Sequence, residues 1–169
     1  MQLFLHRQAV IIPVLCTFLF STPCYAEADE SSMEDTICGA KEAFVFWLWS
    51  SVAGEADPAR VERISNIEDV AITSTDGRVL RGYKLKAGHS RDSGPPTRGY
   101  LLVAQGNAML ADQIIAQFDS FADRGYDVYI FDYRGYGRSE GKRRLKAILH
   151  DYRVIIEHLD RQSYRERAL

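Results

Sequence analysis

The order of apolar and polar positions along the chain predicts a helix, then a hairpin of two strands. The stretch Ile37–Val52 is apolar and rich in aromatic residues, and the serines before it suit a helix N-cap. Apolar and polar residues then alternate over Ile67–Thr75 and again over Val79–Lys86, on either side of Asp76-Gly77. Alternation on both sides of Asp-Gly is the strongest short-range signal for a β-hairpin.

After a polar loop at Gly88–Thr97, the pattern changes to that of a parallel sheet with crossover helices. Gly99–Ala104 and Asp127–Phe131 are nearly continuous apolar runs, which favour strands buried on both faces. Leu110–Arg124 and Arg144–Arg161 carry apolar residues at helical spacing, and in the second they form one stripe. A hairpin followed by strand, helix, strand and helix predicts an α/β fold with an antiparallel edge.

The first residues have the order of a secretory signal. Met1–Gln8 carries a positive charge, Ala9–Phe20 is uncharged and apolar, and Ser21–Ala26 ends in small residues. The apolar run is too short to span a bilayer core comfortably, so cleavage near Ala26 is favoured over an uncleaved membrane anchor. We therefore expect an exported chain, periplasmic or secreted.

The expected cleavage determines which cysteines the mature chain keeps. Cleavage would remove Cys16 and Cys24, which leaves Cys38 as a small buried thiol with no intrachain disulfide. Lipidation of Cys24 is the weaker alternative, because Pro23 beside it makes a poor modification site.

Charge and motif content exclude several classes of function. The chain has 21 Lys+Arg against 23 Asp+Glu, so nothing suggests a nucleic-acid partner. The paired spacing of zinc ligands is absent among His89, His150 and His158. The last two are more simply interpreted as residues on the surface of a helix. No glycine-rich nucleotide motif is present, so we expect neither a metal nor a cofactor.

Two loops follow the buried strands, at the sheet edge where sites form in α/β folds. The first is Gln105–Met109 and the second is Asp132–Gly141. The second contains G-x-S-x-G around Ser139, the pattern of a nucleophile elbow. An elbow serine needs a sharp turn from strand to helix, whereas Ser139 lies well beyond Phe131 in a polar loop. We predict that it forms hydrogen bonds within the loop instead of acting as the nucleophile.

The segments "RGYLLVAQGNA" and "GYDVYIFDYRGYGRSEG", each followed by an amphipathic helix, resemble the first half of α/β-hydrolases. The chain is most similar to the serine-aminopeptidase-like and lysophospholipase-like branch, over Ile64 to Leu169. The resemblance implies a partial α/β-hydrolase fold that stops before the nucleophile strand. The expected organisation is a signal peptide at 1–26, a Trp-rich helical segment at 27–63 and the hydrolase half at 64–169.

The resemblance also implies a site. Gln105-Gly106-Asn107-Ala108 matches the family's His-Gly-x-x oxyanion loop, so the backbone amide of Asn107 would be one donor to the tetrahedral intermediate. Gln105 stands where the family usually has histidine. The backbone donor is retained, but the hydrogen bonds that support the loop must differ.

In the family, the nucleophilic serine, the acid and the histidine come with the fifth strand and later. We therefore expect the truncated N-terminal part of a serine hydrolase that is inactive alone, the complete family acting on small-molecule esters, thioesters or amides. The alternative is a non-catalytic protein that binds a partner through its open sheet edge. Gly99–Ala104 would lack its neighbour on that edge, which predicts self-association or a missing C-terminal half as partner. A third option is contact of the Trp-rich segment with a membrane surface.

Overall fold

The computed structural model describes residues 32–88 and 97–167. The expected signal peptide and most of the polar loop at Gly88–Thr97 lie outside these residues. The chain divides into two compact units, residues 1–44 and 45–169, whose boundary falls within helix α2 (Ser32–Ala53). This helix confirms the one predicted from the aromatic-rich stretch. No helix in the described part of the chain has the length and apolarity to cross a membrane.

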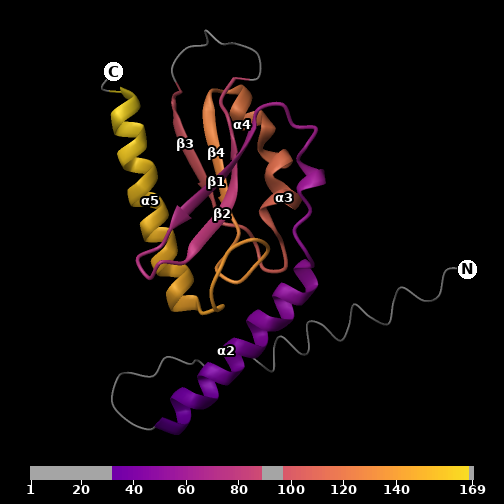
Figure 1. Ribbon diagram of the computed structural model, residues 1–169, viewed down its shortest axis with the longest axis vertical. Helices are drawn as coiled ribbons and strands as arrows, with labels where there is room; N and C mark the ends of the chain where they lie inside the picture. Colours follow the sequence, from indigo (N-terminus) through magenta and orange to yellow (C-terminus); the bar gives the residue numbers. More distant parts are fainter. Residues whose placement is uncertain (1–31, 89–96, 168–169) are drawn as a thin grey trace, which may run out of the picture. The chain divides into compact units, whose positions relative to one another are not determined.

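Four strands form one sheet in the order β1-β2-β4-β3 (Figure 1). The hairpin consists of β1 (Ile67–Thr73) and β2 (Val79–Leu85), which pair antiparallel. Strand β4 (Tyr126–Phe131) pairs antiparallel with β2 and parallel with β3 (Gly99–Val103). The predicted hairpin and parallel strand pair are both confirmed.

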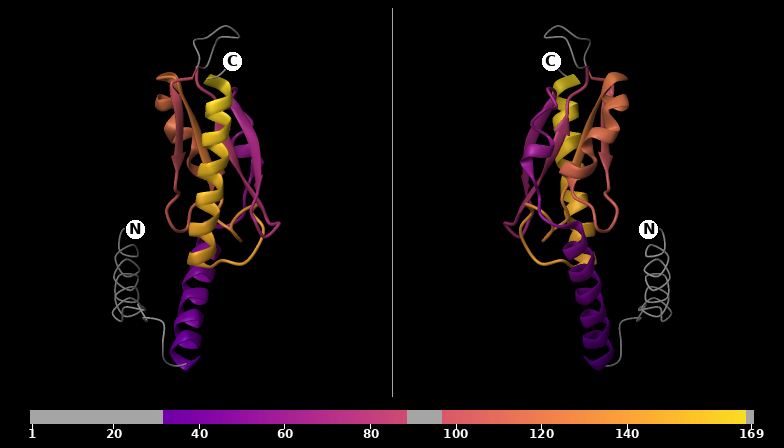
Figure 2. Two further views of the ribbon diagram at one scale, coloured as in Figure 1. Left: turned by 90° about the vertical axis from the view of Figure 1, so that its left-hand side faces the viewer. Right: turned by 90° about the vertical axis from the view of Figure 1, so that its right-hand side faces the viewer.

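Helices cover both faces of this sheet (Figure 2). Because successive side chains of a strand point to opposite faces, Val128 and Ile130 of β4 pack on one side, and Tyr129 and Phe131 on the other. The first side is covered by α3 (Ala111–Ile114), a 3₁₀ segment (Ile115–Phe118) and α4 (Asp119–Asp123), and the second by α5 (Leu145–Arg167). The sheet of four strands with helices on both faces is the α/β architecture that the sequence predicted.

Strand β3 is less buried than its apolar sequence predicts. All five of its residues are half-buried, whereas five of the six residues of β4 are buried. The difference follows from position, because β4 lies between two strands and β3 is the last strand of the sheet. The expectation of a strand buried on both faces is therefore corrected for β3.

The two predicted helices also differ in detail from the sequence pattern. The stretch expected as one helix over Leu110–Arg124 is broken, because the backbone at Ile114 leaves the helical region with φ −120°. On α5 the predicted stripe is only partly buried: Ile155 is 2% exposed, but Leu149 is 56% exposed. Helical spacing placed these residues on α5 correctly, but did not say how much of the helix the sheet covers.

The C-terminal part of α2 packs on the sheet unit. Phe46, Trp49 and Ala53 lie against a cluster that contains Leu110 and Tyr136. This face of the helix therefore belongs to the apolar core of the sheet unit. The expectation for Cys38 is wrong, since Cys38 is disulfide-bonded and its partner lies outside the described residues.

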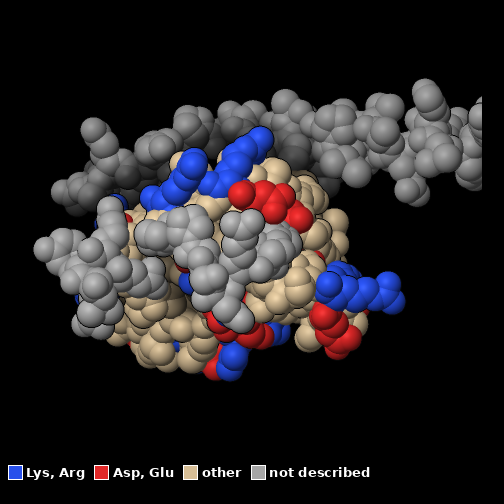
Figure 3. All heavy atoms as spheres, turned by 90° about the horizontal axis from the view of Figure 1, so that it is seen from above, with Lys and Arg blue, Asp and Glu red and all other residues tan. Residues whose placement is uncertain are grey.

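Charged side chains of both signs are interspersed on the end of the sheet unit seen in Figure 3. This agrees with the nearly balanced composition of 21 Lys+Arg and 23 Asp+Glu. The described surface in this view therefore offers no field of one sign that would attract a polyanion.

Gly82 marks the closest approach of two strands. A Cβ at this position would collide with the Ile130 carbonyl oxygen and lie 2.7 Å from the Phe131 Cα atom. Because those atoms are backbone, Gly82→Ala must push β2 away from β4, and we expect a loss of about 1–3 kcal/mol in the free energy of unfolding. Urea titration followed by circular dichroism measures this loss of stability.

Gly106→Ala is the control, since a Cβ there meets only the Met109 sulfur at 3.6 Å. An equal loss in both variants would contradict the steric explanation.

Candidate functional site

The loops after β3 and β4 are joined at the carboxyl end of the sheet. The Tyr133 hydroxyl donates a hydrogen bond to the Gln105 carbonyl oxygen, at the start of the first loop. The Asp132 carboxylate accepts one from the Ala111 backbone amide, 2.8 Å away, just after that loop ends. Two consecutive residues of the second loop thus hold the first loop at both ends.

Between these two anchors lies the predicted oxyanion segment. Asn107 is exposed, and its backbone amide donates no hydrogen bond to any described residue. The next residue, Ala108, has φ +60°, a left-handed conformation that costs a non-glycine residue roughly 1–2 kcal/mol. A turn of this kind persists only when its surroundings hold it, which the anchored ends do. The amide of Asn107 is therefore available to an external acceptor, and its oxyanion role stays a prediction.

Gln105 is buried without any of the hydrogen bonds that its side chain needs. It is 3% exposed, and neither atom of its side-chain amide has a partner among the described residues. The Tyr152 hydroxyl of α5 is also buried without a hydrogen-bond partner, and the Tyr152 ring packs edge-on against Tyr133, 5.7 Å between centroids. Burial raises the pKa of Tyr133 and, more strongly, that of Tyr152. Unsatisfied polar groups of this kind are rare in native interiors, and here one of them belongs to Gln105, the first residue of the predicted oxyanion segment.

The second loop is organised around the Asp132 carboxylate. Asp132 is 2% exposed and also accepts a hydrogen bond from the Arg138 backbone amide at 3.3 Å. Burial raises the pKa of this carboxyl group above its ordinary value. Gly137 has φ +46°, and a Cβ there would lie 2.8 Å from the Asp132 Cγ atom, so only glycine fits this turn.

Ser139 has the hydrogen-bonding role predicted for it. It is 7% exposed, and its hydroxyl donates to the Asp132 carbonyl oxygen at 2.7 Å while accepting from the Arg81 amide at 2.9 Å. A hydroxyl so engaged joins the loop to β2 and faces no histidine. At the exposed surface of α5, the Thr75 hydroxyl lies 2.7 Å from the His150 Nε2 atom.

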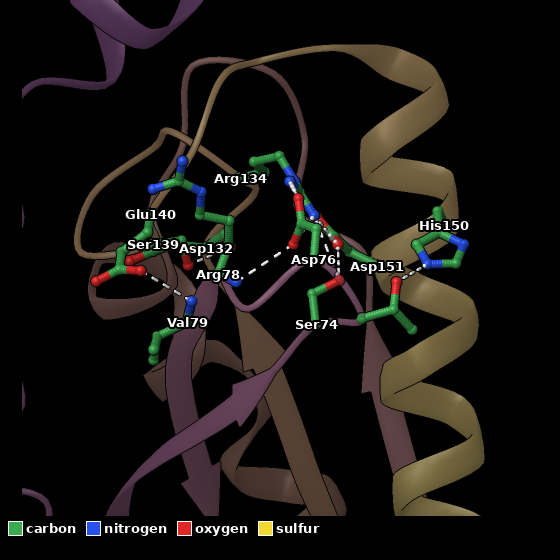
Figure 4. Close-up of polar contacts among 11 residues, drawn as sticks. Ser74, Asp76, Arg78, Val79, Asp132, Arg134, Ser139, Glu140, His150 and Asp151 are labelled. Carbon is green, nitrogen blue, oxygen red and sulfur yellow. Dashed lines mark hydrogen bonds and ion pairs between the residues drawn. The ribbon is translucent and has the colours of Figure 1, made fainter.

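A buried ionic network lies beside these loops and was not predicted from the sequence (Figure 4). The Arg134 guanidinium donates to both carboxylate oxygens of Asp151, at 2.8 and 2.5 Å, and pairs with Asp76 in the hairpin turn. Ser74 donates to the same Asp151 carboxylate at 2.6 Å. The network therefore ties the hairpin, the second loop and α5 together. The one signal in the sequence was Asp151, an acidic residue within the apolar side of a predicted helix.

The Arg134 guanidinium also makes the stability of the protein depend on pH. Its hydrogen bond to Asp76 lowers the pKa of that carboxyl below the ordinary 3.8. A carboxyl with a lowered pKa in the folded state stabilises the fold above its unfolded pKa, and this contribution is lost as the pH falls through the folded pKa. We expect Asp76→Asn to lower the free energy of unfolding slightly at pH 7 and by less at about pH 3, which lies below the ordinary pKa of the carboxyl group. Urea titrations at both pH values test this, and an equal difference at the two would contradict it.

The described ranges, 32–88 and 97–167, contain no group of three or more His, Cys, Asp or Glu side chains placed to hold a metal ion. The sequence thus predicted both loops and the hydrogen-bonding role of Ser139. It did not predict the Arg134 network or the hydrogen bonds by which Asp132 and Tyr133 hold the first loop. Those contacts join positions far apart in the chain, which periodicity does not report.

Residues 95–169 match the family model described as serine aminopeptidase, S33. No curated protein sequence matches the chain. Among solved structures, the esterase Pf2001 of Pyrococcus furiosus is 22% identical, covering 67% of this chain and 42% of its own, with a TM-score of 0.48. An alpha-beta hydrolase from Vibrio vulnificus is 17% identical over 88% of this chain and 42% of its own, with a TM-score of 0.46. The chain spans about two fifths of the length of either structure.

Proposed function

We propose that this chain contributes the oxyanion loop of a serine hydrolase, a proposal supported by the match of residues 95–169 to the family model described as serine aminopeptidase, S33. The complete enzyme would cleave a small-molecule ester, thioester or amide by acyl transfer. Its nucleophile, acid and histidine would be supplied by sequence other than the described residues.

One observation carries this proposal: the amide of Asn107 donates to no described residue and lies on a loop held at both ends. Preorganised donors of this kind stabilise a developing oxyanion without reorganising during the reaction, and one donor is worth about 3–4 kcal/mol. The loop follows β3, the edge strand of the sheet. A further strand added at that edge would bring its own carboxyl end beside Asn107, where a nucleophile is needed.

The hydrogen bonds of Ser139 also support a nucleophile that lies elsewhere than in the described residues. Its hydroxyl already serves two backbone groups, so it lacks both the base and the exposure of an activated nucleophile. Oxyanion donors without a nucleophile leave only a residual rate. We expect the chain of 169 residues alone to show no serine-hydrolase activity.

Labelling with a fluorophosphonate probe at neutral pH tests the proposal. The chain alone should not react, whereas the chain extended by the coding sequence beyond Leu169 should react at a serine in the added part. Peptide mapping identifies the labelled residue. Stoichiometric labelling of Ser139, or an extension that lacks a strand followed by G-x-S-x-G, would contradict the proposal.

The edge position of β3 favours a second candidate function, a non-catalytic protein that binds a partner there. An edge strand offers unpaired backbone N–H and C=O groups to another strand. The two functions separate on Asn107→Pro, which removes the amide. A binding protein would keep its affinity in this variant, whereas a hydrolase would lose its activity.

We also propose that the chain is exported and that its signal is cleaved near Ala26. The supporting observation is the charged, apolar and small-residue order of the first 26 residues. Sequencing of exported material should read Glu27-Ala28-Asp29. An intact Met1 in the membrane fraction would count against cleavage.

A further inference from the structure

Two tyrosines from different parts of the fold meet the backbone of Gln105, the first residue of the predicted oxyanion segment. The Tyr133 hydroxyl, from the loop after β4, donates a hydrogen bond to the Gln105 carbonyl oxygen. The Tyr152 hydroxyl, from α5, is buried beside the same residue. Burial raises the pKa of Tyr152 and so does the nearby Tyr133, whereas the Gln105 backbone amide lowers it. The oxyanion segment is therefore held where it begins, just after β3 ends.

The two tyrosines also support each other. Their rings pack edge to face, with centroids 5.7 Å apart and planes inclined by 60°. Burial raises the pKa of Tyr133, while the Tyr152 hydroxyl lowers it, as a donor that faces the Tyr133 oxygen does. The Tyr152 hydroxyl forms no hydrogen bond with a described residue that would turn it elsewhere. The order of contacts thus runs from Tyr152 through Tyr133 to Gln105.

The side chain of Gln105 takes no part in this support. It is 3% exposed, and neither polar atom of its amide has a partner among the described residues. The contact that holds the loop is made to the main chain instead, by the Tyr133 hydroxyl. A hydrogen bond to a backbone carbonyl does not depend on which side chain stands at position 105.

Fixing the Gln105 carbonyl limits where the Asn107 amide can point. The two groups belong to consecutive peptide planes, which are rigid, so only the φ and ψ angles of Gly106 separate them. Glycine leaves these angles free over a wide range, so the loop needs an anchor here. Ala108, just beyond, has φ +60°, which persists only where the surroundings hold the chain. The Tyr133 hydroxyl supplies that anchor at the start of the segment.

We propose that Tyr133 is a positioning residue of the oxyanion loop and that Tyr152 keeps the Tyr133 hydroxyl in place, an inference that rests on the proposed function. Tyr133 acts through the Gln105 carbonyl and touches neither the substrate nor the reacting atoms. Because Tyr152 belongs to α5, the direction of the Asn107 amide also depends on how this helix packs on the sheet.

Amide ¹⁵N relaxation of the 169-residue chain tests whether the tyrosines hold the loop. The order parameter of the Asn107 amide should be about 0.85 in the wild type, as in rigid backbone, and should fall to about 0.6 in Tyr133→Phe. Tyr152→Phe should lower it by less. This measurement needs no enzymatic activity, so it tests the anchor separately from the proposed function.

Tyr136→Phe is the matched control. Tyr136 lies in the same loop, its ring packs against Tyr133 with centroids 5.9 Å apart, and its hydroxyl also donates to a backbone carbonyl, that of Phe46 at 3.4 Å. The variant removes a hydrogen bond of the same kind and leaves Gln105 untouched. It should keep the Asn107 amide rigid, and urea titration establishes that each variant is folded.

Kinetics of the chain extended by the coding sequence beyond Leu169 test the consequence for catalysis, with a p-nitrophenyl ester as substrate. Tyr133→Phe should lower kcat about tenfold with little change in KM, because a displaced donor is missed mainly in the transition state. Tyr136→Phe should keep both constants within about twofold. Tyr152→Phe should lower kcat by less than Tyr133→Phe, and the double variant should lose no more than Tyr133→Phe alone, since Tyr152 acts through Tyr133.

The outcomes separate this inference from the proposed function. Loss of activity in Asn107→Pro beside full activity in Tyr133→Phe overturns the inference and leaves the proposed function standing. Full activity in both variants overturns both. An Asn107 amide that is equally rigid in the wild type and Tyr133→Phe, or a kcat that falls as far in Tyr136→Phe, also overturns the inference. Additive losses in the double variant overturn the part given to Tyr152.

Discussion

Arg134→Ala should lower the free energy of unfolding by about 3–5 kcal/mol, because it leaves the Asp151 carboxylate buried without its cation. The two side chains are 7% and 3% exposed, and two hydrogen bonds join them. Removing one partner of a buried pair costs far more than the pair contributes, since the remaining charge loses its compensation. Domains of this size are stable by only about 5–15 kcal/mol, so a large share of the variant should be unfolded. Urea titration followed by tryptophan fluorescence measures the change.

An exposed ion pair of the same sheet provides the control. Lys86 and Glu68 lie 2.5 Å apart with side chains that are 50% and 43% exposed. Water screens such a pair, so Lys86→Ala should cost less than about 1 kcal/mol. Arg134→Lys should fall between the two, because lysine keeps the charge but cannot donate to both carboxylate oxygens at once. Similar small losses for Arg134→Ala and Lys86→Ala would show that burial does not determine how much the Arg134–Asp151 pair contributes to stability.

Local patterns in the sequence were sufficient for the four strands and for the antiparallel and parallel pairings within the sheet. Asp76-Gly77 between two alternating stretches predicted the hairpin, since that dipeptide favours the turn whatever surrounds it. The apolar run before Gln105 predicted β3, and the order strand, helix, strand predicted a parallel pairing such as the one with β4. Ser139 was correctly separated from a nucleophile elbow, because its distance from the preceding strand is itself a property of the sequence.

The remaining features depend on contacts between distant positions. Arg134 meets Asp76 and Asp151 only because the hairpin turn and α5 reach the same end of the sheet. The partial exposure of β3 depends on whether another strand lies beside it, and the apolar run is the same in either case. Likewise the sequence showed that Gln105 departs from the family, but not that its side-chain amide would be buried without partners.

Asn107→Pro should lower the kcat of the complete hydrolase about 10²- to 10³-fold, in the protein that joins this chain to a nucleophile-bearing half. Proline has no backbone N–H, so the substitution removes the proposed donor to the tetrahedral intermediate. That donor acts on charge which develops in the transition state, so KM should change little. Initial rates with a p-nitrophenyl ester over a range of concentrations separate the two constants.

Asn107→Ala is the matched control, because it removes the side chain and keeps the amide. It should retain activity within a few-fold of the wild type if the backbone donor is what matters. Proline at 107 also restricts Gly106 to extended conformations, so the stability of both variants must be compared by urea titration. Loss of activity in Asn107→Pro at unchanged stability, with Asn107→Ala active, assigns the oxyanion role to this amide. Equal loss in both variants assigns the effect to the side chain instead, and equal activity in both would remove Asn107 from the site.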